Sequence, residues 1–177
     1  MATEAEKRMH RCCFTGHRPE KLQEPEGVVV AALEKEIRQA IADGFSVFIS
    51  GMARGVDIWA AEIVLRLRDA GEAIRLICAC PYQGFERGWK QSWQDRYNTI
   101  LSAADLVRHI CPGYSQSCFQ RRNGWMVDHS ARVIAVWNGQ PSGTKNTIDY
   151  ATYQHCQMDS IAAAVKKYFT FKSELAD

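Results

Sequence analysis

The chain has 177 residues and a mass of 20.0 kDa, enough for one domain that buries roughly two-thirds of its unfolded surface. Hydrophobic residues make up 46% and charged residues 24%, an ordinary globular composition that excludes a largely disordered chain. The formal net charge of +2 is too small to favour a polyanionic partner. Nucleic acid is therefore not the expected partner, although a local basic face is compatible with this total.

The seven cysteines contain no C-x-x-C pair, and their odd number does not favour a disulfide framework. The segment Met1–Arg8 is charged and lacks the apolar region of a secretory signal, so we expect reduced thiols in a cytoplasmic protein. No apolar run approaches the roughly 20 residues of a membrane span, so no membrane partner is expected. The five histidines show no metal-ligand spacing, so no metal site is expected.

Short apolar segments alternate along the chain with longer segments of helical periodicity, which is typical of βαβ units in a parallel sheet. The first two strands are expected at Met9–Thr15 and Phe45–Ser50. Between them, apolar residues recur at every fourth position from Val29 to Ile41, which predicts a helix with one buried face. Asp43-Gly44 ends this helix, because glycine tolerates the left-handed conformation found after helix ends.

A second helix is expected after Gly55, with apolar side chains from Val56 to Leu67 facing inward, and it ends at Gly71. The third strand is predicted at Ala73–Cys80. Aromatic side chains then recur at every fourth position, which predicts a helix over Phe85–Ala104. We interpret this aromatic stripe as core, with stacking on a base as the alternative.

The remaining strands are expected at Asp105–Cys111 and Arg132–Trp137, with a helix over Ser115–Ser130 between them. The turn Asn138–Thr144 then opens a helix that runs through Tyr153. Within residues 156–177, Ala162–Phe169 has helical character, and no closing apolar strand is evident. The sequence thus predicts one α/β domain over residues 1–177, Rossmann-like, with an open, mostly parallel sheet and helices on both faces.

Three loops with unusual content follow expected strands, at Gly16–Pro19, Gly51–Asp57 and Asn138–Thr144. In an open parallel sheet, ligands bind beyond the carboxyl ends of the strands, where such loops lead into helices. Glycine lets backbone N–H groups approach a phosphate, and a helix N-terminus adds unpaired donors and partial positive charge. The alternative is that these glycines serve tight turns only. Neither a Walker A motif nor a clean G-x-G-x-x-G motif is present.

Several of these segments resemble one superfamily of proteins. Residues 50–57, with the sequence SGMARGVD, resemble the SG-x-A-x-G-[IV]-D element of the DprA/Smf proteins. The Gly143-Thr144 turn resembles the G-T turn of the Lonely Guy phosphoribohydrolases. Phe14–Pro19, Trp59–Glu62 and Arg122-Asn123 resemble the YpsA-like branch of the same superfamily, which is called SLOG.

The resemblance extends from about residue 11 to residue 151 and implies a Rossmann-like domain that binds nucleotides or nucleotide-derived ligands. It implies no particular reaction, because the YpsA-like branch has none that is settled. Arg122 falls where the Lonely Guy enzymes have an arginine, but Thr147 stands where they have a catalytic glutamate. Threonine cannot stabilise an oxocarbenium-like centre as a carboxylate does, and Asp149 is shifted by two positions.

The candidate ligand-binding residues belong to the three loops and to the helix before the last strand. They are Gly16, Arg18, Ser50, Gly51, Arg54, Gly55, Asp57, Arg122, Asn123, Gly139, Gly143 and Thr144. Arg18 is expected to clamp a phosphate or else to form a surface ion pair. Arg54 has little packing purpose inside a glycine turn, which favours a functional role. Asp57 accepts a ribose hydroxyl or else simply stabilises its helix N-terminus.

We therefore expect a domain that binds or senses a nucleotide-type small molecule through glycine-rich turns. The first alternative is an enzyme that cleaves an N-glycosidic bond, and the second is a DprA-like binder of single-stranded DNA. No catalytic residue and no cofactor is assigned, beyond a nucleotide or phosphate-bearing molecule as ligand. The sequence is compatible with a homo-oligomer but does not specify one.

Overall fold

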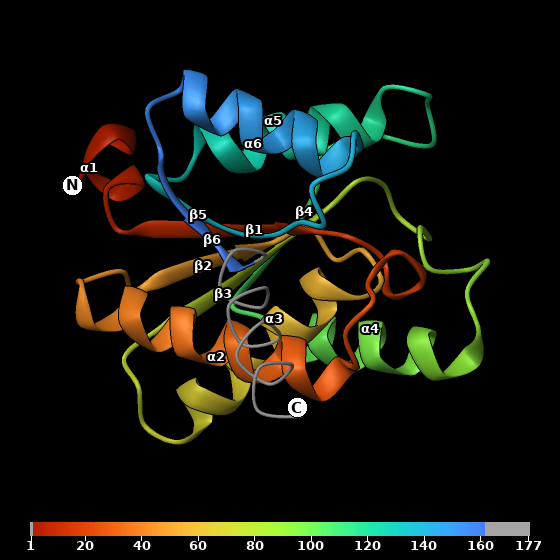
Figure 1. The fold of residues 1–177 in the computed structure, drawn as a ribbon, viewed down its shortest axis with the longest axis horizontal. Coiled ribbons are helices and arrows are strands. Elements are labelled where there is room, and N and C mark those ends of the chain that lie inside the picture. Colours follow the sequence, from red (N-terminus) through yellow and green to blue (C-terminus); the bar gives the residue numbers. More distant parts are fainter. Residues whose placement is uncertain (1, 162–177) are drawn as a thin grey trace, which may run out of the picture.

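The computed structural model describes residues 2–161 and contains one six-stranded sheet, with all strands parallel (Figure 1). The strands are β1 (Arg11–Gly16), β2 (Val47–Ser50), β3 (Arg75–Cys80), β4 (Leu106–His109), β5 (Arg132–Val136) and β6 (Gln157–Ser160). Their order across the sheet is β4-β3-β2-β1-β5-β6. The predicted Rossmann-like α/β fold class is thus confirmed.

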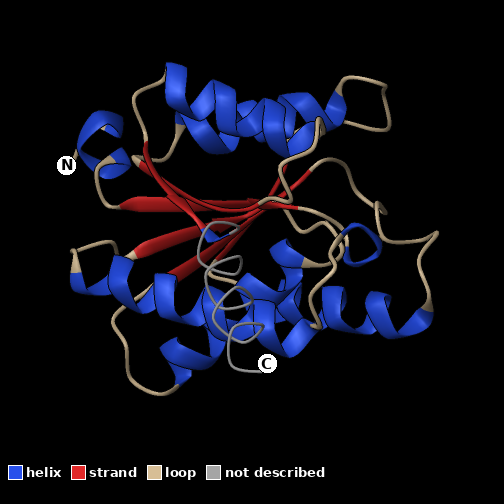
Figure 2. Ribbon diagram, in the orientation of Figure 1, coloured by secondary structure: helices blue, strands red, loops and turns tan. Residues whose placement is uncertain are grey.

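Helices cover both faces of the sheet, as Figure 2 shows. They are α1 (Glu4–Arg8), the 3-10 turn η1 (Pro19–Lys21), α2 (Glu26–Ala42), α3 (Val56–Asp69), α4 (Gln91–Ala103), α5 (Cys118–Asp128) and α6 (Gly143–Tyr153). Helices α2, α3 and α4 lie on one face, and α5 and α6 lie on the other (Figure 1). None of the helices within residues 2–161 is long and apolar enough to span a bilayer.

Two hydrophobic clusters fill the spaces between the sheet and its helix layers. On the α2 side, Val29, Leu33 and Ile37 are buried at the spacing that the sequence periodicity predicts. On the other side, Met126 and Ala151 pack against β1 and β5. All seven cysteines are buried and free, as expected for small apolar side chains in a protein without disulfides.

The prediction of a helix over Phe85–Ala104 is wrong for its first six residues, because α4 begins only at Gln91. Residues 81–89 form turns, and Gly84 has a φ of +81°, a conformation that does not continue a helix. The fourfold spacing there reflects an aromatic cluster instead. Phe85 and Trp89 meet edge to face with ring centroids 4.9 Å apart.

The structure also contains a strand that the sequence pattern does not reveal. Strand β6 pairs with β5 only and lies at the edge of the sheet, so its exposed positions are polar. A partly exposed strand lacks the continuous apolar run that identifies a central strand of a parallel sheet. The expected helical segment Ala162–Phe169 lies outside the described residues.

The order of the strands has a switch point between β1 and β5. Strands β2, β3 and β4 are added on one side of β1, whereas β5 and β6 lie on the other side. Helix α2, which follows β1, and helix α6, which follows β5, cover opposite faces (Figure 1). The loops that leave these neighbouring strands therefore separate, and such a switch point is where open α/β sheets form ligand crevices.

Candidate functional site

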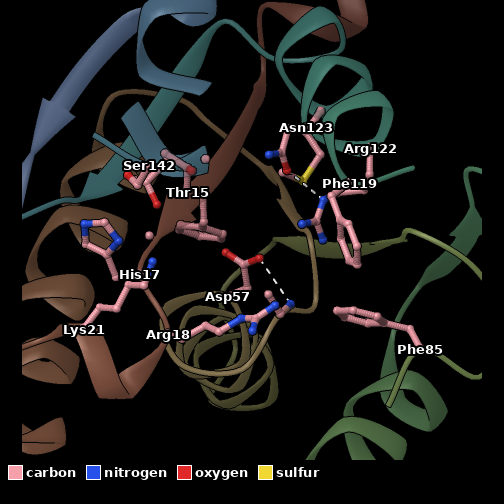
Figure 3. Close-up of a pocket in the computed structure, with 16 residues that line it drawn as sticks. Thr15, His17, Arg18, Lys21, Asp57, Phe85, Phe119, Arg122, Asn123 and Ser142 are labelled. Atoms are coloured by element: carbon pink, nitrogen blue, oxygen red, sulfur yellow. Dashed lines mark hydrogen bonds between the residues drawn. The ribbon is translucent and has the colours of Figure 1, made fainter. Parts of the chain in front are cut away.

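A pocket of about 360 Å³ opens at this switch point, beyond the carboxyl ends of β1 and β5 (Figure 3). Seven of the predicted residues line it, namely Gly16, Arg18, Asp57, Arg122, Asn123, Gly143 and Thr144. The other five do not line it, namely Ser50, Gly51, Arg54, Gly55 and Gly139. The fold thus brings residues from three separate loops and from α5 to one place.

One end of the pocket is formed by the N-terminus of α6. The Ser142 hydroxyl accepts a hydrogen bond from the backbone N–H of Lys145 at 3.2 Å and so caps the helix. The N–H groups of Gly143 and Thr144 donate to no other group among the described residues. Free donors at the positive end of an 11-residue helix are suited to binding an anion.

Two cationic side chains line the same pocket, Lys21 on the side of this helix end and Arg18 below Asp57 (Figure 3). Arg18 follows β1, and Lys21 closes the 3-10 turn η1; both are exposed and both line the pocket. Neither forms an ion pair with a described carboxylate. Their charges are therefore available to a negatively charged ligand, in contrast to most other arginines of the chain.

His17 adds a buried polar group to the same end of the pocket (Figure 3). Its side chain is 4% exposed, and its Nε2 has no hydrogen-bond partner among the described residues. Burial lowers the pKa of His17, because the interior disfavours the charged imidazolium. A neutral imidazole offers a ligand one hydrogen bond rather than a positive charge.

Asp57 lies in the first turn of α3 and is 5% exposed. Its Oδ2 accepts a hydrogen bond from the backbone N–H of Ala53 at 3.2 Å, whereas its Oδ1 has no partner among residues 2–161. Burial raises the pKa of Asp57 to about 6. An unpartnered carboxylate oxygen that lines a pocket is a ready acceptor for a ligand hydroxyl or amine.

Arg122 projects from α5 and packs against the turn that follows β2. Its Nη1 donates to the carbonyl oxygen of Gly51, and its Nε donates to Oδ1 of Asn123 at 2.8 Å. A Cβ at Gly51 would lie 2.6 Å from Arg122 Nη1 and 2.8 Å from Asp57 Oδ2. Gly51 therefore lets the guanidinium and the carboxylate approach the same turn. The Asn123 oxygen accepts this hydrogen bond, so the Nδ2 donors are the part of the amide that a ligand can use.

Two other predicted glycines permit close packing between loops. A Cβ at Gly16 would lie 2.5 Å from the side chain of Val56, at the start of α3. Gly55 has a φ of +91°, and a Cβ there would lie 2.8 Å from the backbone oxygen of His17. These glycines hold the β1 loop against the β2 loop. Direct contact of their backbone with a ligand stays a prediction.

The remaining predicted residues support the site from outside. The Ser50 hydroxyl donates to the backbone oxygen of Asp57 at 2.8 Å and accepts from the N–H of Met52 at 3.2 Å. Arg54 forms an ion pair with Glu20 at 2.7 Å. The surface ion pair that we considered for Arg18 is thus found at Arg54. Gly139 has a φ of +86° in the turn before α6.

Sequence reasoning did not single out several pocket residues, above all Lys21, Ser142 and Phe119. Lys21 lies three residues after Arg18, and Ser142 precedes Gly143 in the position of a helix cap, so both had local signals. Phe119 had none, because one phenylalanine in an amphipathic helix is ordinarily part of the core.

A larger hollow of about 660 Å³ lies at the amino ends of the strands, and residues of α1 line part of it. Charged side chains line it, including Arg11, which pairs with Glu4, and Asp105, which pairs with Arg68. No buried unpartnered side-chain atom of the described residues faces it. It therefore lacks the unsatisfied groups that distinguish the switch-point pocket. No group of three or more His, Cys, Asp or Glu within residues 2–161 is placed to hold a metal ion.

An open parallel sheet with a polar pocket at its switch point places this protein in the class of Rossmann-like α/β domains. Comparison of sequences gives the family. The profile of the YspA SLOG family (YpsA) matches residues 12–168, and the chain belongs to that family. The SLOG resemblance found in the sequence is thus confirmed.

Proteins of several bacilli are similar over most of the chain. A UPF0398 protein of Bacillus pumilus (strain SAFR-032) is 28% identical over 156 residues, which cover 82% of this chain and 83% of that protein. The SPbeta prophage-derived protein YoqJ of Bacillus subtilis (strain 168) is 32% identical over 116 residues, 59% of this chain and 68% of that one. Neither name states an activity.

Solved structures of DNA processing protein A (DprA) share the fold. The Streptococcus pneumoniae protein has a TM-score of 0.62 at 18% identity, over 86% of this chain and 50% of that one. The Helicobacter pylori protein, whose structure concerns its single-stranded DNA binding mode, has a TM-score of 0.59 at 17% identity, over 89% of this chain and 66% of that one. This chain thus spans about half of the first protein and just under two-thirds of the second.

Proposed function

We propose that the switch-point pocket binds a nucleotide or nucleotide-derived small molecule and holds its phosphate at the N-terminus of α6. The observation that carries the proposal is that one pocket contains several free anion-binding groups. These groups are the N–H donors of Gly143 and Thr144 and the unpaired charges of Arg18 and Lys21. Helix donors and cations together are the usual means of holding a phosphate.

Residues in the pocket supply less support for hydrolysis of an N-glycosidic bond. Thr147, at the position of the catalytic glutamate in the resembling hydrolases, is 1% exposed, and its hydroxyl donates to the backbone oxygen of Gly143 at 2.9 Å. It does not line the pocket. The pocket acid is Asp57, which comes from a different element. We therefore expect AMP incubated with the protein to release no measurable free adenine or ribose 5-phosphate.

The direct test is isothermal titration of the full chain with AMP, GMP and ribose 5-phosphate. We expect binding of these phosphorylated ligands, and we expect G143V to weaken it at least about tenfold, because the valine side chain would keep the phosphate from the N–H donors and so prevent their charge-assisted hydrogen bonds. A Cβ at Gly143 meets nothing within 4 Å, so the variant should keep the melting temperature of the ligand-free protein. The matched control is G113V, since Gly113 is equally unobstructed and lies outside the pocket.

Two outcomes would contradict the proposal. Undiminished affinity in G143V would mean that the turn before α6 is only structural. Binding of a single-stranded oligonucleotide that weakens steeply with salt, without binding of mononucleotides, would instead favour the DNA-binding function named for one structural neighbour.

A further inference from the structure

The two ends of the switch-point pocket differ in chemistry. In Figure 3, Ser142, His17 and Lys21 lie on one side, whereas Phe85 and Phe119 lie on the other, with Arg122 and Asn123 beside Phe119. Asp57 lies between these two groups (Figure 3). A pocket with helix donors and a cation at one end, and aromatic rings beside an amide and a guanidinium at the other, suits a ligand that is negatively charged at one end and planar with polar edges at the other.

Neighbouring aromatic side chains hold the two phenylalanines in place. Phe85 comes from the turn after β3 and is buried, with its ring 4.9 Å from that of Trp89 and 5.7 Å from that of Tyr82. Phe119, in the first turn of α5, is half-buried, and its ring lies 5.6 Å from that of Phe85. These contacts restrain the rings, so a ligand that stacks on them loses little additional side-chain entropy.

We propose, building on the nucleotide-binding function above, that the aromatic end is a base subsite. In this arrangement the planar base packs against Phe119 with Phe85 beneath it, a ribose hydroxyl donates to Asp57, and the phosphate reaches the N-terminus of α6. The order of the three parts of a nucleotide matches the order of the three groups along the pocket. The ligand class is thus a nucleoside monophosphate or a close derivative.

The size of the pocket limits the ligand further. Its volume of about 360 Å³ is near the lower end of the range for small-molecule sites, which is roughly 300–1,000 Å³. One nucleotide is a better match to this volume than a dinucleotide such as NAD. The Phe119 ring reads the face of a base rather than its edge, and stacking of this kind tolerates different bases.

The test compares ligands with and without a base, by isothermal titration of the full chain. F119A should weaken binding of AMP and GMP about 5- to 100-fold, the usual effect of removing a stacking ring, and leave binding of ribose 5-phosphate unchanged. F119L keeps an apolar side chain without an aromatic face, so it retains packing if F119A folds poorly, and it should show the same selective loss. Y153A is the matched control, because Tyr153 is exposed and lies outside the pocket.

The double variant R18A/K21A separates this inference from the proposed function. It should weaken ribose 5-phosphate and AMP alike, because both carry the phosphate. The base subsite is refuted if AMP and ribose 5-phosphate bind equally well and F119L changes neither, while R18A/K21A still weakens both. If neither compound binds the wild-type protein, the proposed function fails and the subsite fails with it.

Discussion

At the scale of single residues, Asp57 lines the candidate site but lowers the stability of the fold when it is ionised. Its carboxyl group is buried beside α5, where the charged Arg122 lies across Gly51 from it, and only one of its oxygens has a partner among the described residues. Burial nevertheless dominates and raises the pKa to about 6. The folded protein therefore binds this proton more tightly than the unfolded chain does, and ionised Asp57 destabilises the fold.

We predict that D57N removes this pH-dependent cost. Above about pH 7 the wild type carries the full cost of the buried charge, about 3 kcal/mol for the shift from 3.8 to about 6. As the pH falls through 6 toward 3.8 the carboxyl becomes protonated and the cost disappears. The stability of D57N relative to the wild type should accordingly be greatest at pH 8 and fall by about 2 kcal/mol by pH 4.

Urea unfolding at pH 8, 7, 6, 5 and 4 measures this difference. D95N is the control, since Asp95 is exposed on α4, and its stability relative to the wild type should change little over the same range. A D57N difference that does not vary with pH would show that burial of the charge is compensated in a way that the described contacts do not reveal.

At the scale of elements, one residue of helix α5 lowers the stability of that helix. Gly124 lies in the interior of this helix, where glycine increases the entropy lost on folding. A Cβ at Gly124 would meet only the Tyr150 ring of α6, at an ordinary contact distance of 4.0 Å. Space and helix geometry therefore both permit alanine at this position.

We predict that G124A stabilises the protein by about 0.5–1 kcal/mol, through helix propensity and the added contact with α6. The midpoint of urea unfolding should rise without a change in slope. The contrasting variant is G44A, because Gly44 has a φ of +94° and alanine there is strained. A lower midpoint for G124A than for the wild type would mean that α5 and α6 are packed too closely to accept one methyl group.

At the scale of the whole molecule, Arg132 connects the edge strand to the rest of the fold. Its side chain is 2% exposed and pairs with Asp159 of β6 and with Asp43 at the end of α2, the latter at 2.6 Å. Burial alone would lower the pKa of Arg132, but the two carboxylates together raise it. One guanidinium thus joins β5 to the edge strand β6 and to the C-terminal end of α2.

We predict that R132Q loosens β6 before it affects the centre of the sheet. The variant loses charge-assisted hydrogen bonds to two partly exposed carboxylates, at a cost of about 2–3 kcal/mol, and part of this cost should be local because β6 has one strand neighbour. In hydrogen exchange, amides of residues 157–160 should exchange faster in the variant, whereas those of β2 should change only with global stability. Equal loss of protection in both strands would show that β6 unfolds only together with the whole sheet.

The succession of most strands and helices was determined by the sequence alone, because it depends on hydrophobic periodicity and on turn residues. The central strands β1, β2 and β5 were predicted from short apolar runs, and α2 from its fourfold spacing. Strand β6 and the true start of α4 were not predicted. The first is partly polar at a sheet edge, and the second is preceded by an aromatic turn that imitates helical spacing.

The composition of the pocket was decided only by the tertiary structure. Glycine-rich turns marked the loops that converge there, but Gly51 and Gly55 prove to lie against protein atoms, whereas Gly143 is open. Whether a glycine faces a ligand or a neighbouring side chain depends on what other elements bring to it. The same holds for Phe119, because an aromatic residue on a helix becomes part of a pocket only when a distant turn, here that of Phe85, leaves part of its ring uncovered.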